Sequence, residues 1–164
     1  MATLKKGICV LKCDKNHIHG VVKFKELSNK KVEVDIYVTN IPKGKHGIHI
    51  HRLGNEINSP HSLCDHFNPE NYSHGDVNEL VSHAGDLGNI IVQYIPSSQK
   101  YIGRKILISN KIKLRGENSV YGRSVIVHSN EDDLGRGDHP QSKTTGNSGS
   151  RILYGIIGVD DDCE

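Results

Sequence analysis

The stretch from residue 31 to residue 39 constrains the fold most, because its side chains alternate strictly between two chemical classes. Val32, Val34, Ile36 and Val38 are each separated by one charged or polar residue. A repeat of two residues sends successive side chains to opposite faces of an extended strand. The pattern therefore predicts an antiparallel strand with one buried face and one solvated face.

Short strand patterns recur along the chain, whereas helical periodicity appears nowhere. They predict strands at 7–12, 20–27, 31–39, 47–51, 86–95, 101–113, 122–128 and 152–159. Two segments without periodicity, 52–85 and 129–150, interrupt this series, and loops of such length are normally functional or disordered. We expect a single all-β domain over residues 1–164, an eight-stranded Greek-key β-barrel or sandwich with two long functional loops.

Composition excludes several classes of protein. A formal net charge of +2 and a pI near 8.3, with dispersed lysines and arginines, argue against a nucleic-acid-binding surface. No apolar run approaches the roughly 18 residues needed to cross a membrane, and the first residues lack a signal-peptide core. Four cysteines are too few for a disulfide scaffold in 164 residues. We expect a cytoplasmic protein that binds neither membranes nor nucleic acid.

Six of the eleven histidines lie between residues 47 and 86. His49 and His51 alternate with isoleucines, so one face of a strand carries both imidazoles. The remaining candidates follow in or just after the first long loop: His66, His74, His83 and Asp86. An isolated histidine is usually a solvated or core residue, but this concentration indicates a metal site.

The donor types suit two kinds of metal. Three loop imidazoles with the Asp86 carboxylate make a closed four-ligand set of the kind that zinc adopts. His49, His51 and the distant His128, at the end of its own strand, would supply an all-nitrogen set, which favours Cu(II). The clustering predicts metal binding more strongly than it selects the metals.

Seven short motifs carry a more specific signal. They are GIHIH (47–51), DHFNP (65–69), SHG (73–75), HAGDLGN (83–89), GRSVIVH (122–128), DDLG (132–135) and TGNSGSR (145–151). In order and spacing they resemble the signatures of the copper/zinc superoxide dismutases of the eukaryotic cytosolic type, over nearly the whole chain. The resemblance implies superoxide as substrate, copper and zinc as cofactors, and a homodimer formed through strand ends such as 155–158.

The resemblance also assigns the ligands by position. Copper would be bound by His49, His51, His66 and His128, and zinc by His66, His74, His83 and Asp86. His66 would be shared as a deprotonated ring between the two cations, which stabilise its negative charge. The implied reaction converts superoxide to oxygen and hydrogen peroxide by alternating reduction and reoxidation of copper. His66 would donate a proton, and zinc would keep its oxidation state.

Further residues match family positions beside the ligands. Arg151 matches an arginine that docks the anion near copper, and it could also tie loop carbonyls together. Asp132 matches a carboxylate that joins a copper histidine to a zinc histidine. His46 matches a framework histidine that hydrogen-bonds strands. Four histidines have no ligand counterpart and are expected at the surface: His17, His19, His61 and His139.

The chain departs from the family at its usual intrasubunit disulfide. Pro60 and Tyr154 occupy the two cysteine positions, and Cys64 has no evident partner. We expect free thiols, with a bond from Cys64 to Cys163 or another cysteine as the alternative. Losing such a crosslink costs about 2–5 kcal/mol, so zinc or a dimer partner is expected to hold the loop. Dependence on a copper chaperone is left open.

A second departure concerns the charges that attract superoxide. The matching positions before Arg151 hold Pro140, Gln141 and Thr144, with Lys143 beside them. We expect electrostatic steering that is retained but altered, so the reaction rate should still depend on ionic strength.

Two other functions are consistent with a dismutase-like sequence. One is a non-enzymatic homologue that binds zinc or sequesters a copper chaperone, but such proteins lose copper ligands or the arginine. The other is a copper-delivery protein, which would need an additional metal-binding module. The complete donor set and Arg151 favour the enzyme.

Overall fold

The strongest sequence pattern forms a strand where it is expected. The computed structural model describes residues 4–13 and 17–160, and within it β3 (Val32–Thr39) buries every second residue. Val34, Ile36 and Val38 are fully buried, because the alternation directs them into the interior of the sheet.

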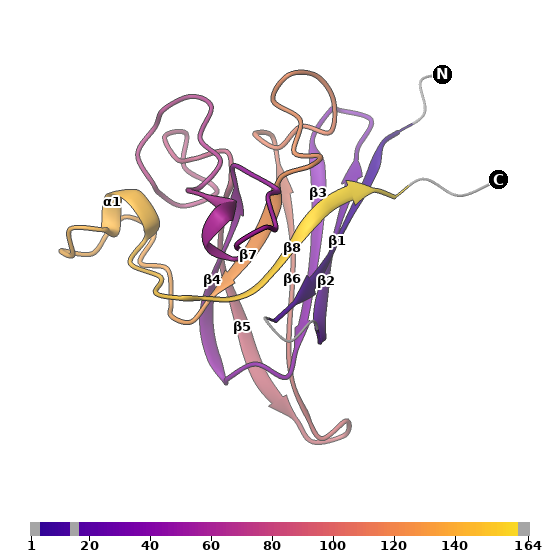
Figure 1. Cartoon of the computed structure of the whole chain (residues 1–164), viewed down its shortest axis with the longest axis vertical. Helices are drawn as coiled ribbons and strands as arrows, with labels where there is room; N and C mark the ends of the chain where they lie inside the picture. The colour runs from indigo at the N-terminus through magenta and orange to yellow at the C-terminus, as the bar shows by residue number, and fades with distance from the viewer. Residues whose placement is uncertain (1–3, 14–16, 161–164) are drawn as a thin grey trace.

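Eight antiparallel strands close into a barrel (Figure 1). The others are β1 (Lys6–Lys12), β2 (Ile18–Glu26), β4 (Gly44–His51), β5 (Asp86–Ile95), β6 (Lys100–Ser109), β7 (Ser124–His128) and β8 (Arg151–Val159). Around the barrel the order is β1-β2-β3-β6-β5-β4-β7-β8, and β8 pairs back with β1. Because β3 pairs with β6 and β4 with β7, the connections are Greek-key crossovers. The predicted all-β, eight-stranded fold is confirmed.

One large cluster of apolar side chains fills the barrel. Val, Ile and Leu dominate it, and Phe24 is its largest fully buried member. A second, smaller cluster lies apart from it and consists of Leu63, Ile126 and Tyr154, with Ile156 packed against it. The small cluster contains residues from the first long loop, β7 and β8, so it joins that loop to the barrel.

Local structure differs from the sequence prediction in a few places. Two short helices form, the 3-10 helix η1 (His61–Leu63) and α1 (Ser142–Thr145). Three or four residues are too few to produce a helical period, so no pattern could have predicted them. The strand predicted at 101–113 ends at Ser109, although Ile112 and Leu114 beyond it are buried in the core.

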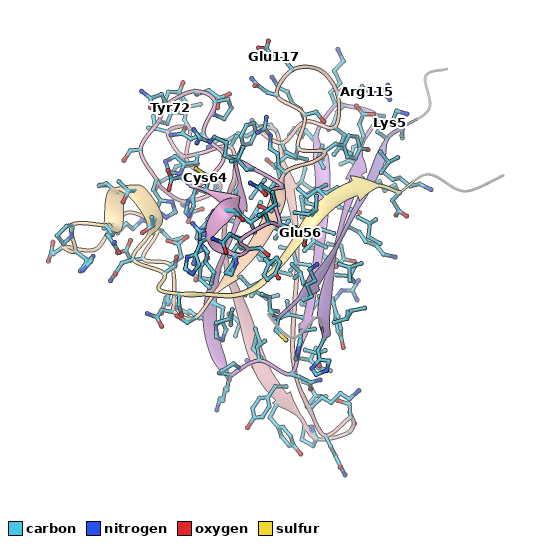
Figure 2. The ribbon with its side chains drawn as sticks, in the orientation of Figure 1. Lys5, Glu56, Cys64, Tyr72, Arg115 and Glu117 are labelled. Carbon is cyan, nitrogen blue, oxygen red and sulfur yellow. The ribbon has the colours of Figure 1, made fainter. Side chains whose placement is uncertain are left out.

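The two long loops lie against each other outside the barrel. The backbone N–H of His74, in the first loop, donates to the carbonyl of Lys143 in α1 over 2.9 Å. Glu56, Cys64 and Tyr72 mark the course of the first loop beside the barrel (Figure 2). Within the described residues, no helix is long and apolar enough to span a membrane.

Candidate metal centre

Strand β4 lies between β5 and β7 and carries the first two histidines into the interior. His49 and His51 are essentially inaccessible to solvent, and His128, at the end of β7, is buried as well. The registers of β4 with β5 and of β7 with β8 are irregular at His49 and His128. Such irregularities re-aim side chains and are common beside functional sites.

The first long loop returns to β4 and brings His66 beside these rings. The N–H of Phe67 donates to the Ile50 carbonyl, and the N–H of Ile50 donates to the Gly85 carbonyl, both over 2.8 Å. A Cβ on Gly85 would lie 2.3 Å from the Ile50 carbonyl oxygen, so only glycine permits this approach. The loop backbone therefore seats His66 next to the histidine strand.

Four buried imidazoles converge to form the first donor cluster. One ring nitrogen from each of His49, His51, His66 and His128 lies within 4.8 Å of the others. Within the described part of the chain, the Nδ1 atom of His49 and the Nε2 atoms of the other three are buried without a hydrogen-bond partner. Buried polar atoms are normally paired, because leaving them unpaired costs free energy. The residues therefore fit an all-nitrogen metal site.

In each of these four rings the second nitrogen is engaged. Nδ1 of His51 lies 2.7 Å from the Cys64 carbonyl oxygen, and Nδ1 of His128 lies 3.2 Å from that of Gly149. Since a carbonyl oxygen only accepts, each Nδ1 carries the proton and each Nε2 keeps a lone pair. Nε2 of His49 lies 2.8 Å from Asp132 Oδ2. Such partners fix the ring and tautomer of a ligating histidine.

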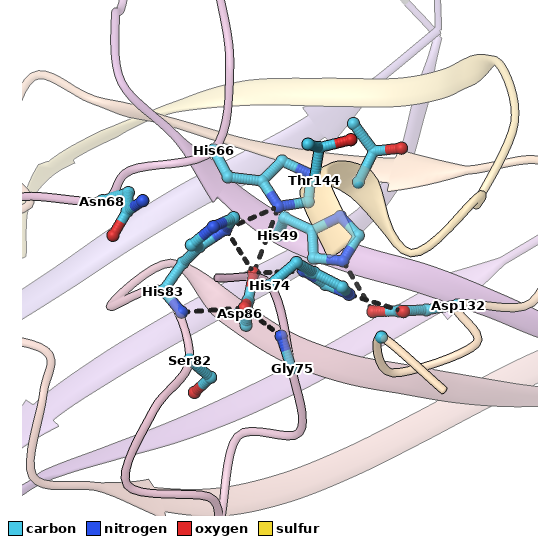
Figure 3. A network of polar contacts seen from close by, with 12 residues as sticks. His49, His66, Asn68, His74, Gly75, Ser82, His83, Asp86, Asp132 and Thr144 are labelled. Carbon is cyan, nitrogen blue, oxygen red and sulfur yellow. Dashed lines mark hydrogen bonds and ion pairs between the residues drawn. The ribbon is translucent and has the colours of Figure 1, made fainter. Parts of the chain in front are cut away.

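A second cluster surrounds the Asp86 carboxylate (Figure 3). Its Oδ1 lies 3.1, 3.0 and 3.2 Å from the Nδ1 atoms of His66, His74 and His83. The Nδ1 atoms of His66 and His83 are 3.4 Å apart. Ligands about 2.0 Å from a tetrahedral zinc are separated by about 3.3 Å, so these spacings suit zinc. The backbone N–H groups of Gly75 and His83 hold the Oδ2 atom.

His66 belongs to both clusters through different nitrogens. Its Nδ1 faces Asp86, whereas its Nε2 is one of the partnerless buried atoms of the first cluster. The ring is 3.9 Å from that of His49 between centroids. The donor set therefore permits the two metal positions to share this ring.

Asp132 connects the clusters from the second long loop. Its two carboxylate oxygens each lie 2.8 Å from an Nε2 atom, Oδ2 from that of His49 and Oδ1 from that of His74. Asn89 clamps the backbone of Asp132 through reciprocal amide hydrogen bonds of 2.8 Å. A Cβ on Gly146 would lie 1.9 Å from Asp132 Oδ1, and Gly146 has a φ of +65°. Both restrictions require glycine there.

Burial keeps the first cluster in the neutral form that binds metal. It lowers the pKa of His49 and of His51 well below the ordinary value, and the nearby His66 lowers both further. It lowers the pKa of His128 to about 4. At neutral pH these rings offer lone pairs without first losing a proton.

Charge dominates the second cluster instead. Burial lowers the pKa of His74, but its contacts with Asp132 and Asp86 outweigh this effect and raise the pKa to about 9. Burial raises the pKa of Asp86 and of Asp132, but their histidine contacts hold both well below the ordinary value. The carboxylates are therefore ionised and offer the negative charge that a cation needs.

Arg151 lies directly across the β7–β8 ladder from His128. Its guanidinium donates to the carbonyls of Pro60 and Cys64, over 2.6 Å each. The Cys64 carbonyl also accepts from His51, so one backbone oxygen connects Arg151 to the first cluster. The expectation that Arg151 ties loop carbonyls together is borne out, and anion docking remains a proposal.

Apolar packing joins the first loop to β8 near one position of the family's disulfide. The three described cysteines, Cys9, Cys13 and Cys64, are free, whereas Cys163 lies outside the described residues. Leu63 is fully buried beside Tyr154, the residue at one of the family's cysteine positions. Sequence reasoning missed this contact, because nothing in the sequence pairs residues so far apart.

The other histidines are placed as expected with one exception. Both ring nitrogens of His46 face backbone carbonyls, those of His128 and Pro42, at 2.8 Å, which matches a framework role. His17, His61 and His139 are exposed. The expectation for His19 was wrong, because this ring is half-buried and its Nδ1 contacts the Thr39 carbonyl at 3.2 Å.

Comparisons with known proteins agree with this geometry. The family model described as copper/zinc superoxide dismutase matches residues 18–157. The chain belongs to the copper/zinc superoxide dismutase family. Copper and zinc are therefore its cofactors, and two buried donor groups could hold metal ions, one of His49, His51, His66 and His128 and one of His49, His66, His74 and Asp86.

Two relatives and one solved structure match nearly the whole chain. Superoxide dismutase [Cu-Zn] 5 of Dictyostelium discoideum is 43% identical over 157 residues, covering 93% of this chain and 97% of its own. A provisionally named Cu-Zn superoxide dismutase of Autographa californica nuclear polyhedrosis virus is 39% identical over 155 residues, covering 94% and 98%. The crystal structure of the clock protein EA4 has a TM-score of 0.87 and 35% identity, and 98% of each chain is covered.

Proposed function

We propose that this enzyme dismutates superoxide at the two clusters, with His49, His51, His66 and His128 holding copper and His66, His74, His83 and Asp86 holding zinc. The partnerless buried nitrogens of the first cluster are the observation that carries this assignment. Two superoxide ions and two protons give one oxygen and one hydrogen peroxide. Copper, when bound, supplies the one-electron redox chemistry of both halves of this reaction.

His66 handles a proton in this proposal. Its Nδ1 remains beside Asp86, while Nε2 faces the first cluster and has no hydrogen-bond partner among the residues that the structure describes. Nε2 is therefore the atom that takes up a proton and passes it to the reduced product. Asp86 and Asp132 position the rings, because their oxygens contact His66, His74 and His49.

Arg151 binds and orients the anion. The guanidinium is half-buried, carries fixed hydrogen bonds to the first loop and lies across the ladder from His128. A positive charge held beside the first cluster attracts a small anion and stabilises the negative charge on peroxide as it forms.

The test is an assay of superoxide removal by the purified protein loaded with one copper and one zinc per chain. We expect activity that requires copper and that falls about 10–100-fold in Arg151→Gln, the loss expected for one charge-assisted hydrogen bond. Arg123→Gln is the matched control, because Arg123 packs on Phe67 and donates to the backbone carbonyls of Ser119 and Arg52, away from both donor clusters. Absence of activity in the fully loaded protein would refute the proposal.

We also propose that two chains associate through the outer face of β1, β2 and β8. Val10 and Ile18 are exposed there, and they line a hollow together with Ile156. Sedimentation should give a dimer that Val10→Lys converts to a monomer. Ile91→Lys, on the exposed face of β5, should leave it intact. A monomer without any substitution would exclude this interface.

The cytoplasm is the proposed location. The three free cysteines support a reducing compartment, since thiols persist there. Cell fractionation with an antibody to the chain would test it, and recovery outside the cytoplasm would overturn it.

A further inference from the structure

The end of the β1–β2 hairpin gathers three metal-ligating side chains that the metal centre does not use. One ligand atom from each of Cys13, His17 and His19 lies within 4.8 Å of the others. In the sequence they form a Cys-x-x-x-His-x-His pattern. None of the three belongs to the donor sets around His66, and their proximity was not predicted.

Backbone geometry explains why the three side chains meet. The N–H of Cys13 donates to the carbonyl of His17 over 3.2 Å and holds these two residues close together. The β1–β2 register is irregular between Leu11 and Lys12. His17 directly precedes β2 and His19 is the second residue of that strand, and a spacing of two places side chains on one face of an extended chain.

The His19 ring shows the arrangement typical of a metal ligand. Its Nδ1 lies 3.2 Å from the carbonyl oxygen of Thr39, at the end of β3. Because that oxygen can only accept, Nδ1 carries the ring proton and Nε2 keeps its lone pair. Ligating histidines usually hold their second nitrogen against a carbonyl or carboxylate in this way. Cys13 is a free thiol, half-buried against the core.

We propose that Cys13, His17 and His19 form a third metal site, which takes a thiophilic ion of the Cu(I) and Zn(II) class. One thiolate and two imidazoles suit these ions, whereas Mg²⁺ and Ca²⁺ require oxygen ligands. On binding, the Cys13 S–H proton passes to solvent, a sulfur–metal bond forms, and no electron is transferred. The protein supplies three donors and His17 is exposed, so a solvent molecule can occupy the remaining coordination position of the bound ion.

The experiment uses the full-length protein with copper and zinc already filling the metal centre. After excess metal is removed, one further equivalent of Zn(II), or of Cu(I) under anaerobic conditions, is added in separate samples. We expect a third equivalent to be retained after gel filtration with at least one of these ions. We also expect it to slow alkylation of Cys13 by iodoacetamide at least tenfold, with the modified residue located by mass spectrometry. The comparison of the two samples identifies the preferred ion.

Variants separate this site from the metal centre and from nonspecific binding. His17→Gln and Cys13→Ser should each lose the third equivalent. Because His17 is exposed, His17→Gln should keep the fold and the superoxide dismutase activity. His139→Gln, on another exposed histidine, should retain the third equivalent. The proposal would be overturned if the protein retained neither ion, or if His17→Gln still retained the third equivalent. Either result could occur while superoxide dismutation proceeds normally, so it would leave the proposed function intact.

Discussion

The two donor clusters share His66 but are built differently. Three of the four rings of the first cluster belong to strands, His49 and His51 in β4 and His128 in β7. In the second cluster only Asp86 belongs to a strand, and its three histidines come from the loop 52–85. Ladder hydrogen bonds position the first set, whereas polar contacts to Asp86 and Asp132 position most of the second. Folding of the barrel thus positions three of the four rings of the first cluster, whereas the second cluster depends mainly on contacts within and between the loops.

Replacing His128 should have the largest effect and separate the clusters. His128→Asn removes one nitrogen from the first cluster, and His128 is not among the three rings that contact the Asp86 carboxylate. We expect superoxide removal to fall to the level of the metal-free protein while about one equivalent of zinc per chain remains bound. Metal analysis and the activity assay measure both. Unchanged activity would exclude His128 as a copper ligand.

Replacing Asp86 should affect the loop more than the barrel. Asp86→Asn removes the negative charge that the Nδ1 atoms of His66, His74 and His83 contact. We expect loss of zinc and amide exchange at least tenfold faster across 52–85, with the β3–β6 ladder unchanged. Asp76→Asn, in the same loop but paired with Arg136, is the control. Equally faster amide exchange in β3 would contradict the view that the second cluster stabilises the loop and not the barrel.

Replacing Asp132 should weaken both clusters together. Asp132→Asn removes the carboxylate that contacts His49 on one side and His74 on the other. Loss of such a partner typically costs 10–100-fold in metal affinity or activity, so we expect roughly that loss for both metals. The adjacent Asp133→Asn provides the comparison, because Asp133 contacts Gly135 and Ser142 instead. An effect on one metal alone would show that Asp132 does not couple the clusters.

Truncating Leu63 should test the packing that anchors the loop. Leu63 is fully buried, so Leu63→Ala should lower the free energy of unfolding by about 2–4 kcal/mol. Leu80, in the same loop, is 86% exposed, so Leu80→Ala should change stability by less than about 0.5 kcal/mol. Urea unfolding of both variants measures the difference. Equal stabilities would mean that Leu63 does not anchor the loop.

The last expected effect, similar in size to that of Leu63→Ala, is the pH dependence of the metal-free protein. His128 has a folded pKa of about 4 against an ordinary value of 6.5, so between these values the unfolded chain binds more protons. Stability is therefore present above pH 6.5 and is lost as pH falls toward 4, by about 3 kcal/mol from this ring. Thermal unfolding of chelator-treated protein from pH 8 to pH 4 measures it. In His128→Asn the stability should depend less on pH. Identical pH dependence in the two proteins would show that His128 is not its source.

Sequence patterns were most informative where one period controls the structure. The alternation at Val32–Thr39 determined which face of β3 is buried, and the loop-borne histidines indicated metal before any geometry was available. Patterns failed for α1 and η1, which are shorter than a helical period can reveal. They also missed Asn89, because its partner Asp132 lies 43 residues further along the chain.

The sequence by itself determined the strand faces, the donor types and the family motifs, since these depend on residue identity and local spacing. Only the tertiary structure decided which nitrogen of each histidine is engaged, that Leu63 packs on Tyr154, and that Cys13 meets His17 and His19. Those features depend on distances between segments remote in the chain. Barrel closure and loop packing set such distances, and no local period encodes them.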